Sequence, residues 1–284
     1  MSTVLRLARR ELVEAGRNYW FAVNSGLFVV GALALLLFGQ QDVAVLGYRG
    51  VARALAGLMQ LALFLVPLMA LFPAAAALAG EREVGTLDYL LAQPVTREEV
   101  HAAKWIGVGA AVAGSLALGF AVAAGIGLGR GVPPFLMAAL AGLALLLAAV
   151  FVSVGTWISA RAATQGRATS VGLTVWLLFL ALGSLGLMGA FVAWGIPPAA
   201  LEAWAFLNPV EAFRMAMIVV LDPGVRVLGP VGADLVRTLG RTTVVAGAVA
   251  SLVAWAATGF WAGRRAFAAP ARSSSPPPPG ESGR

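Results

Sequence analysis

The sequence predicts an all-α, polytopic membrane protein with six transmembrane helices. Of the 284 residues, 60% are hydrophobic and only 12% are charged, and the mean hydropathy is +0.87. A soluble domain of this length could not cover its surface with so few charged side chains. Apolar runs close to the roughly 20 residues that a helix needs to cross a bilayer recur along the chain. We expect spans at residues 21–38, 55–79, 105–128, 135–159, 171–195 and 244–262.

Residues 4–17 are expected to form an interfacial amphipathic helix before the first span. One face carries Leu5, Ala8, Leu12 and Ala15, and arginines and glutamates occupy most other positions. This pattern is typical of a helix that lies along a membrane surface. A cleaved signal peptide is the alternative, but no small-x-small cleavage site follows the apolar run, so we expect this run to remain as a span.

The third span carries small residues at every fourth position, in the series Gly107, Ala111, Ser115, Gly119, Ala123 and Gly127. Such a series allows a neighbouring helix to approach closely. We interpret it as a helix-packing face. The lining of a pore is the less favoured alternative.

Residues 80–104 form a long charged segment between the second and third spans. Thr86 is expected to cap a short helix there, in which Leu87, Leu90 and Leu91 lie on one face. Pro94 would end this helix. The leucine face lies among acidic and basic side chains, as at a protein interface, although a solvated connector is the alternative.

A second helix is expected to begin directly after the short one. Thr96 is followed three residues later by Glu99, which is the pattern of a capping box. The helix would run through Lys104 into the third span. The segment would then present a short transverse helix at the water boundary between two spans.

The arginines and the single lysine indicate how the chain is oriented. Thirteen of these twenty residues lie in the segments 1–20, 80–104, 160–170 and 263–284, and seven lie in 39–54, 129–134 and 196–243. Because basic residues accumulate on the cytoplasmic side, we expect both termini and the charged segment inside the cell. The net charge of +7 is therefore interpreted as a topology signal that faces anionic lipid, and not as a nucleic-acid surface.

Several classes of chemistry are disfavoured by missing residues. The six expected spans contain no Asp, Glu, Lys, Arg or His, the chain has no cysteine, and no GxxxxGK[ST] phosphate loop occurs. An intramembrane enzyme is an alternative of another class, but the only histidine, His101, lies in the charged segment, and acid-rich pairs for magnesium are missing. These absences favour the non-catalytic membrane subunit of an ATP-driven transporter whose ATPase is a separate chain.

The segment 196–243 is too long for a simple connection and too apolar for a free loop. Two short runs with helical spacing are separated by a break at Asn208, and neither is long enough to span. We expect a re-entrant helical hairpin in the outer leaflet, with Asn208 capping the second helix. Asp234 and Arg237 would then be free to meet an extracytoplasmic partner; a hairpin that only seals the bundle is the alternative.

The pieces LARRELVEAGRNYW, GEREVGTLDYLLAQPVTREEV and the six spans together resemble the permeases of the type-2 ABC exporter class. In that class the segment between spans two and three is a coupling helix that docks on the ATPase. The order of PLMAL, LNPVEAFR and LGPVGADL further resembles the permeases that serve maturation of the copper sites of nitrous oxide reductase. The resemblance implies a homodimer in the bacterial inner membrane, two cytoplasmic ATPases that hold ATP and magnesium, and an outer β-helix protein.

The resemblance also assigns residues. Its coupling motif matches Gly80, Glu81, Gly85, Thr86, Leu87, Leu90, Leu91 and Pro94, and its outer pattern matches Asn208, Pro209 and Arg214. No cofactor is expected on this chain. Met215 and Met217 are the closest pair of soft ligands, but methionine is more often apolar filling, so we expect no metal site.

The sequence does not determine what is transported. It could be copper or a sulfur species, or the chain could transport nothing and transmit force to its outer partner instead. An exporter of a lipid, drug or polysaccharide is the alternative within the class. Residues 1–267 are expected to form one transmembrane domain. The remainder, 268–284, is rich in proline and serine and is expected to be disordered.

Overall fold

The computed structural model describes residues 3–16, 19–38, 51–185, 198–221 and 235–269. Within these ranges the protein is almost entirely helical and contains no strand. The elements are α1 (Thr3–Gly16), α2 (Tyr19–Phe38), α3 (Val51–Val84), α4 (Thr86–Leu91), α5 (Arg97–Gly129), α6 (Pro134–Arg161), α7 (Gln165–Leu180), η1 (Ala181–Leu185), α9 (Pro198–Leu207), α10 (Pro209–Leu221) and α12 (Arg241–Ala268). Six helices of the described part are long and apolar enough to cross a membrane, which confirms the predicted fold class.

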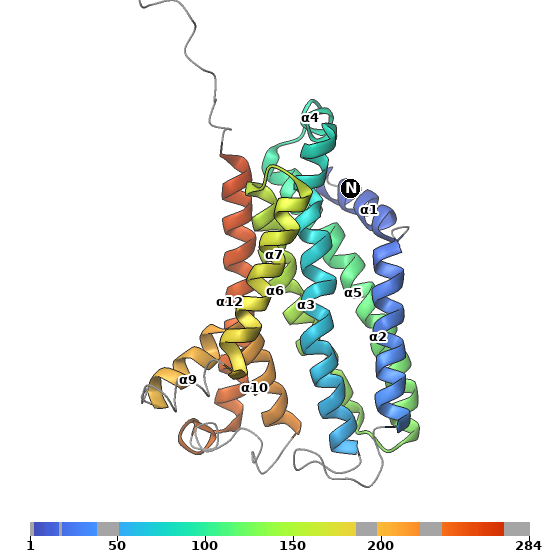
Figure 1. Cartoon of the computed structure of the whole chain (residues 1–284), viewed down its shortest axis with the longest axis vertical. Helices are drawn as coiled ribbons and strands as arrows, with labels where there is room; N and C mark the ends of the chain where they lie inside the picture. The colour runs from blue at the N-terminus through green and yellow to red at the C-terminus, as the bar shows by residue number, and fades with distance from the viewer. Residues whose placement is uncertain (1–2, 17–18, 39–50, 186–197, 222–234, 270–284) are drawn as a thin grey trace, which may run out of the picture.

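The long helices lie side by side in one bundle (Figure 1). The short α4 lies at one end, together with α1 and the C-terminal end of α12, and α9 and α10 lie at the other end. This arrangement places α1 and the end of α12 on the same side, as an even number of crossings requires. The protein is therefore a multi-pass membrane protein.

The helices differ in length from the expected spans, because hydropathy marks only their apolar parts. α3 continues through the charged residues to Val84, and α5 already begins at Arg97. The expected fifth span, 171–195, corresponds to α7 and η1, whose helical geometry is interrupted at Gly183. Residues 186–197 and 270–284, which include most of the expected tail, lie outside the described residues; Ala268 still belongs to α12.

α3 and α6 form the centre of the bundle. About half of the most apolar window of each is buried, 56% in α3 and 50% in α6, against 22% in α7 and in α12. Gly155 of α6 makes the close approach possible: a Cβ there would lie 2.9 Å from the Leu71 carbonyl oxygen and 2.6 Å from the Ala74 Cβ in α3. Because lipid is as apolar as a side chain, such tight packing is a main source of attraction between spans.

The small-residue face of α5 packs as predicted. A Cβ on Gly107 would lie 2.3 Å from the Glu11 Cβ of α1, and one on Gly119 would lie 2.4 Å from the Phe28 ring of α2. On α1, Ala8 is buried whereas Leu5 and Leu12 are exposed. α1 therefore rests on α5 through Ala8 and Glu11 and leaves Leu5 and Leu12 exposed.

Gly155→Ala should destabilise the bundle, because the added methyl group would press on the α3 backbone, which cannot rotate away as a side chain could. We expect the free energy of unfolding to fall by about 1–3 kcal/mol. Gly142 is the matched control on the same helix, since nothing lies within 4 Å of its Cβ position. Thermal unfolding in detergent should show a lower midpoint for Gly155→Ala only; equal midpoints would contradict the described α3–α6 packing.

Candidate functional site

The chain turns from α3 into α4 within one residue. Gly85 has φ 80° and ψ 2°, a left-handed conformation that favours glycine, and it takes the N-cap position of α4. The expectation that Thr86 caps this helix is wrong, because Thr86 is its first residue and its Oγ1 donates to the Glu81 carbonyl oxygen at 3.3 Å. The turn therefore depends on the left-handed conformation of Gly85, and no side chain caps α4.

The leucine face of α4 packs against the protein's own helices. Leu87 and Leu90 are 5% and 9% exposed. They belong to a buried apolar cluster that also contains Leu78, Val100, Ala160 and Phe267, from α3, α5, α6 and α12, with Leu91 at its edge. The leucines therefore attach α4 to the end of the bundle, and the docking of this segment on an ATPase stays a prediction.

The second helix begins as predicted. The Glu99 backbone N–H donates to the Thr96 Oγ1 at 3.2 Å, and the Thr96 backbone N–H donates to the Glu99 Oε2 at 2.8 Å, which completes the capping box. Pro94 follows the end of α4. His101 lies inside this helix, α5, and is fully buried, with its ring 5.4 Å from that of Phe260 in α12.

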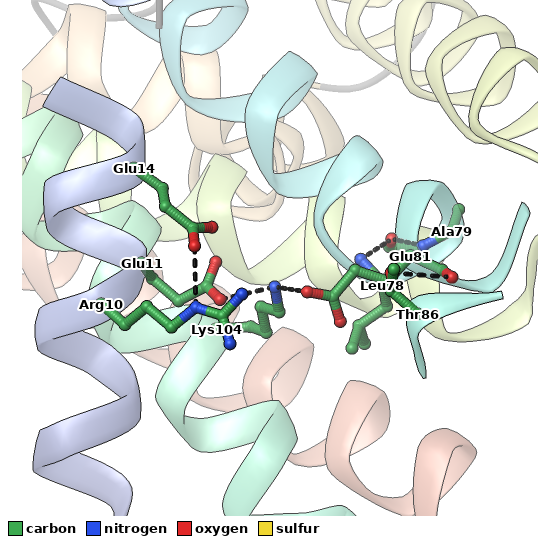
Figure 2. Close-up of polar contacts among 9 residues, drawn as sticks. Arg10, Glu11, Glu14, Leu78, Ala79, Glu81, Thr86 and Lys104 are labelled. Atoms are coloured by element: carbon green, nitrogen blue, oxygen red, sulfur yellow. Dashed lines mark hydrogen bonds and ion pairs between the residues drawn. The ribbon is translucent and has the colours of Figure 1, made fainter. Parts of the chain in front are cut away.

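Lys104 joins three helices at this end of the bundle. Its Nζ donates to the Glu11 Oε1 of α1 at 2.6 Å and to the Glu81 Oε1 of α3 (Figure 2). The Lys104 side chain is only 5% exposed. Burial raises the pKa of the Glu11 carboxyl above its ordinary value, although Lys104 acts in the opposite direction. One buried ammonium therefore serves two carboxylates, an arrangement that we call the Lys104 triad.

The two residues after Glu81 reach two further helices. The Arg82 guanidinium donates to the carbonyl oxygens of Ser159, Ala160 and Ala162 at the C-terminal end of α6. The Glu83 Oε2 accepts from the Gln165 backbone N–H at the start of α7, at 2.8 Å. Three consecutive charged residues thus connect the end of α3 to α5 and α1, to α6, and to α7, directly before the Gly85 turn.

The hairpin of α9 and α10 contains the predicted cap. The Asn208 Oδ1 accepts from the backbone N–H groups of Val210 at 3.0 Å and Glu211 at 3.4 Å, and its Nδ2 donates to the Phe179 carbonyl oxygen of α7 at 2.8 Å. α9 and α10 have 10 and 13 residues, too few to span a bilayer. α10 enters the bundle, since Phe213 and Met217 are fully buried. The two-helix prediction is confirmed, and its depth in the outer leaflet stays a prediction.

A buried ion pair in α10 was missed in the sequence. Glu211 is 4% exposed and accepts from the Arg214 guanidinium, and its carboxylate packs against the backbone of Gly183, where a Cβ would lie 2.4 Å from Oε1. The spacing of Glu211 and Arg214 in the sequence could have predicted this pair, because opposite charges at positions i and i+3 of a helix are neighbours on its surface.

The residues matched to the outer pattern are mainly internal. Asn208 and Pro209 are buried, and Arg214 is engaged by Glu211, so these residues shape the hairpin and offer little surface to a partner. Arg237 is exposed, whereas Asp234 lies outside the described residues. Met215 and Met217 are both buried in the apolar core.

Lys104→Met should be destabilising, because it leaves two half-buried carboxylates without their buried counter-charge. Removing one partner of a buried ion pair costs about 3–5 kcal/mol, whereas exchanging every member for an uncharged one is often neutral. The triple variant Lys104→Met, Glu11→Gln, Glu81→Gln should therefore recover most of the thermal midpoint lost by Lys104→Met.

The exposed pair of Arg10 and Glu14, 2.7 Å apart on the same helix, supplies the control. Arg10→Ala should change stability by no more than ~1 kcal/mol. If Lys104→Met had the same thermal midpoint as Arg10→Ala, the Lys104 triad would not hold α1, α3 and α5 together.

Comparison with known proteins places this geometry in a family. The family model described as "ABC-2 family transporter protein" matches residues 5–261. The chain is 30% identical over 273 residues to the "Probable ABC transporter permease protein NosY" of Pseudomonas aeruginosa, an alignment that covers 93% of this chain and 94% of the relative. It is 31% identical over 247 residues to the protein of the same name from Stutzerimonas stutzeri, covering 83% and 89%. The chain belongs to the ABC-2 family of transporter proteins.

Proposed function

We propose that this chain is the membrane permease subunit of a transporter that helps to mature the copper sites of nitrous oxide reductase. Membership of the ABC-2 family supports the role of a permease. The two NosY relatives and the order of the sequence motifs support the more specific role. ATP and magnesium would bind to separate cytoplasmic ATPase subunits, and two copies of this chain would form the membrane part.

The observation that carries the mechanism is the set of charged contacts at the end of α3. Glu81, Arg82 and Glu83 connect α3 to α5, α6 and α7 immediately before α4, and Lys104 extends the connection to α1. A protein that pushes on α4 would therefore move the ends of these helices together. The buried leucines of α4 reinforce this link, because they prevent the short helix from moving independently of the bundle.

The force would travel to the outer side through the bundle itself. α3 and α6 pack too closely to slide freely at Gly155, and both contact α10 of the outer hairpin. Movement of these helices would displace the hairpin and the exposed region around Arg237. We propose that this region meets an extracytoplasmic β-helix protein, so that hydrolysis of ATP inside changes the state of that protein outside.

Deletion of the gene in its own host tests the proposed function. We expect nitrous oxide reductase to lack copper and activity in the deletion strain, and to regain both when a plasmid supplies the chain. Affinity purification of the tagged chain in mild detergent should recover an ABC ATPase and a β-helix protein, identified by mass spectrometry. A copper-replete reductase in the deletion strain would instead favour the exporter of a lipid, drug or polysaccharide.

The proposed topology predicts from which side of the membrane a cysteine introduced at each position can be labelled. The chain contains no cysteine, so single cysteines report without background. Arg237→Cys should react with a membrane-impermeant maleimide added outside and become protected when the β-helix partner is bound, and Asp234→Cys should behave alike. Arg10→Cys on α1 is the control and should react only after the membrane is opened. The reverse pattern would invert the proposed orientation, and labelling unaffected by the partner would leave the hairpin with a sealing role.

A further inference from the structure

A groove lies between α5 and α6 on the surface of the bundle. Its volume is about 320 Å³. The side chains that line it are mainly small or aliphatic, and they include Gly109, Ala110 and Ala113 of α5 and Leu145, Ala148 and Ala149 of α6. Ala110 and Leu145 are exposed, so the groove is open to the surroundings. Because α5 and α6 both cross the membrane, these surroundings are the bilayer.

The groove offers a ligand almost only apolar surface. Among the described residues that line it none is charged, and the Trp105 Nε1 is the one polar side-chain atom. This nitrogen donates to the Ser153 Oγ at 2.8 Å, and the Trp105 ring lies 5.3 Å from that of Phe260 in α12. A polar ligand would therefore give up its contacts with water and find no partner here. The lining suits a hydrocarbon.

The groove extends over the depth of one leaflet. The charged residues of α5 end at Lys104, and the groove begins at Trp105, a residue type that favours the level of the headgroups. The interval from Trp105 to Ala113 corresponds to about 12 Å along the axis of α5. One leaflet supplies about 15 Å of a hydrocarbon core of about 30 Å. The groove therefore follows the direction in which an acyl chain lies.

A helix of a second copy is a poor occupant. One helical turn with its side chains is about 10 Å wide and 5.4 Å high and fills roughly 420 Å³, more than the groove contains. The spans beside the groove are also among the better covered ones. In their most apolar windows 44% of α5 and 50% of α6 is buried, against 28% of α2 and 22% of α7 and of α12. A second copy would find more free surface on those three helices.

We propose that the α5–α6 groove binds one acyl chain of a phospholipid from the leaflet on the α4 side. An unfilled groove would leave its lining atoms without packing partners on one side, and a flexible chain supplies these partners. The bound chain then acts as a packing element between α5 and α6. This site is independent of the species that the transporter moves and of its partner proteins.

The groove recognises the chain of the lipid and not its headgroup. Beyond the Trp105 end, the Phe260 ring contacts that of Trp261, and the Arg264 guanidinium lies over Trp261 at 4.9 Å. Arg264 is already engaged by the Glu98 carboxylate, which accepts from its Nε at 3.0 Å. With this cation neutralised inside the protein, we expect no preference for an anionic headgroup.

A side chain that fills the groove tests the proposal. The full chain is purified in mild detergent, and the phospholipid that stays bound is counted per chain by mass spectrometry. Nothing lies within 4 Å of the Cβ position of Gly109, so Gly109→Leu can enter the groove without a clash. A leucine that displaces about ten packed carbon contacts should lower the retained lipid by ~10-fold.

Gly125→Leu is the matched control for this variant. Gly125 lies on the same helix, its Cβ position is equally free, and it does not line the groove. Gly125→Leu should retain as much lipid as the unmodified chain, and thermal unfolding in the same detergent shows that both variants are folded. Equal retention by Gly109→Leu and Gly125→Leu would overturn the proposal.

Photo-crosslinking tests the unmodified chain. A phospholipid that carries a diazirine in the middle of one acyl chain is added, excess lipid is washed away with detergent, and the sample is irradiated. Adducts should concentrate on Ala110, Ala113 and Ala149. Equal labelling of the exposed Leu118 of α5 and Val253 of α12 would show only general contact with lipid and would overturn the proposal.

Two further results would contradict this assignment. Phosphatidylglycerol and phosphatidylethanolamine probes should label the groove equally, and labelling that requires the anionic headgroup would place recognition at a charged site. Ala110→Cys should form no disulfide between two copies in oxidised membranes. Since the chain has no other cysteine, a disulfide-linked dimer would show that a second copy covers the groove.

Discussion

The buried ammonium of Lys104 is the contact on which the architecture of the α1–α4 end of the bundle depends. Spans surrounded by lipid gain little from the hydrophobic effect when they associate, so polar contacts and tight packing must hold them together. Lys104 binds carboxylates from α1 and α3 while it belongs to α5, which fixes three helix ends at one point. With Arg82 and Glu83 beside it, this end of the bundle behaves as one unit although its spans are far apart in the sequence.

The other end of the bundle follows the same physical logic with different groups. Where α7 loses its helical geometry near Gly183, backbone carbonyl groups are released, and each needs a donor because lipid offers none. Asn208 supplies one to Phe179, and the Trp204 Nε1 supplies another to Leu182 at 2.9 Å. The interruption at Gly183 and the position of the α9–α10 hairpin are therefore linked by these two hydrogen bonds.

Under the proposed function, both ends of the bundle would take part in transmitting movement. The short helix α4 is attached to the bundle by Leu87 and Leu90, which pack inward. Between the ends, α3 and α6 contact closely enough at Gly155 that a displacement of one must be followed by the other. These properties do not require a titratable residue in the membrane, which agrees with a permease driven by a separate ATPase.

The sequence by itself determined the features that depend on neighbouring residues. Six apolar helices, the Thr96–Glu99 capping box and the Asn208 cap follow from composition and short-range spacing, and all are present in the structure. Periodicity also placed Leu87 and Leu90 on one face of a helix. It could not show what that face packs against, because the cluster beneath them comes from segments as distant as Phe267. The partner of Glu81 was likewise decided only by the tertiary structure, since a charged side chain shows in the sequence that it needs a partner but not which distant helix provides one. The close packing of the Glu211 carboxylate against Gly183 also joins segments that are far apart in the sequence.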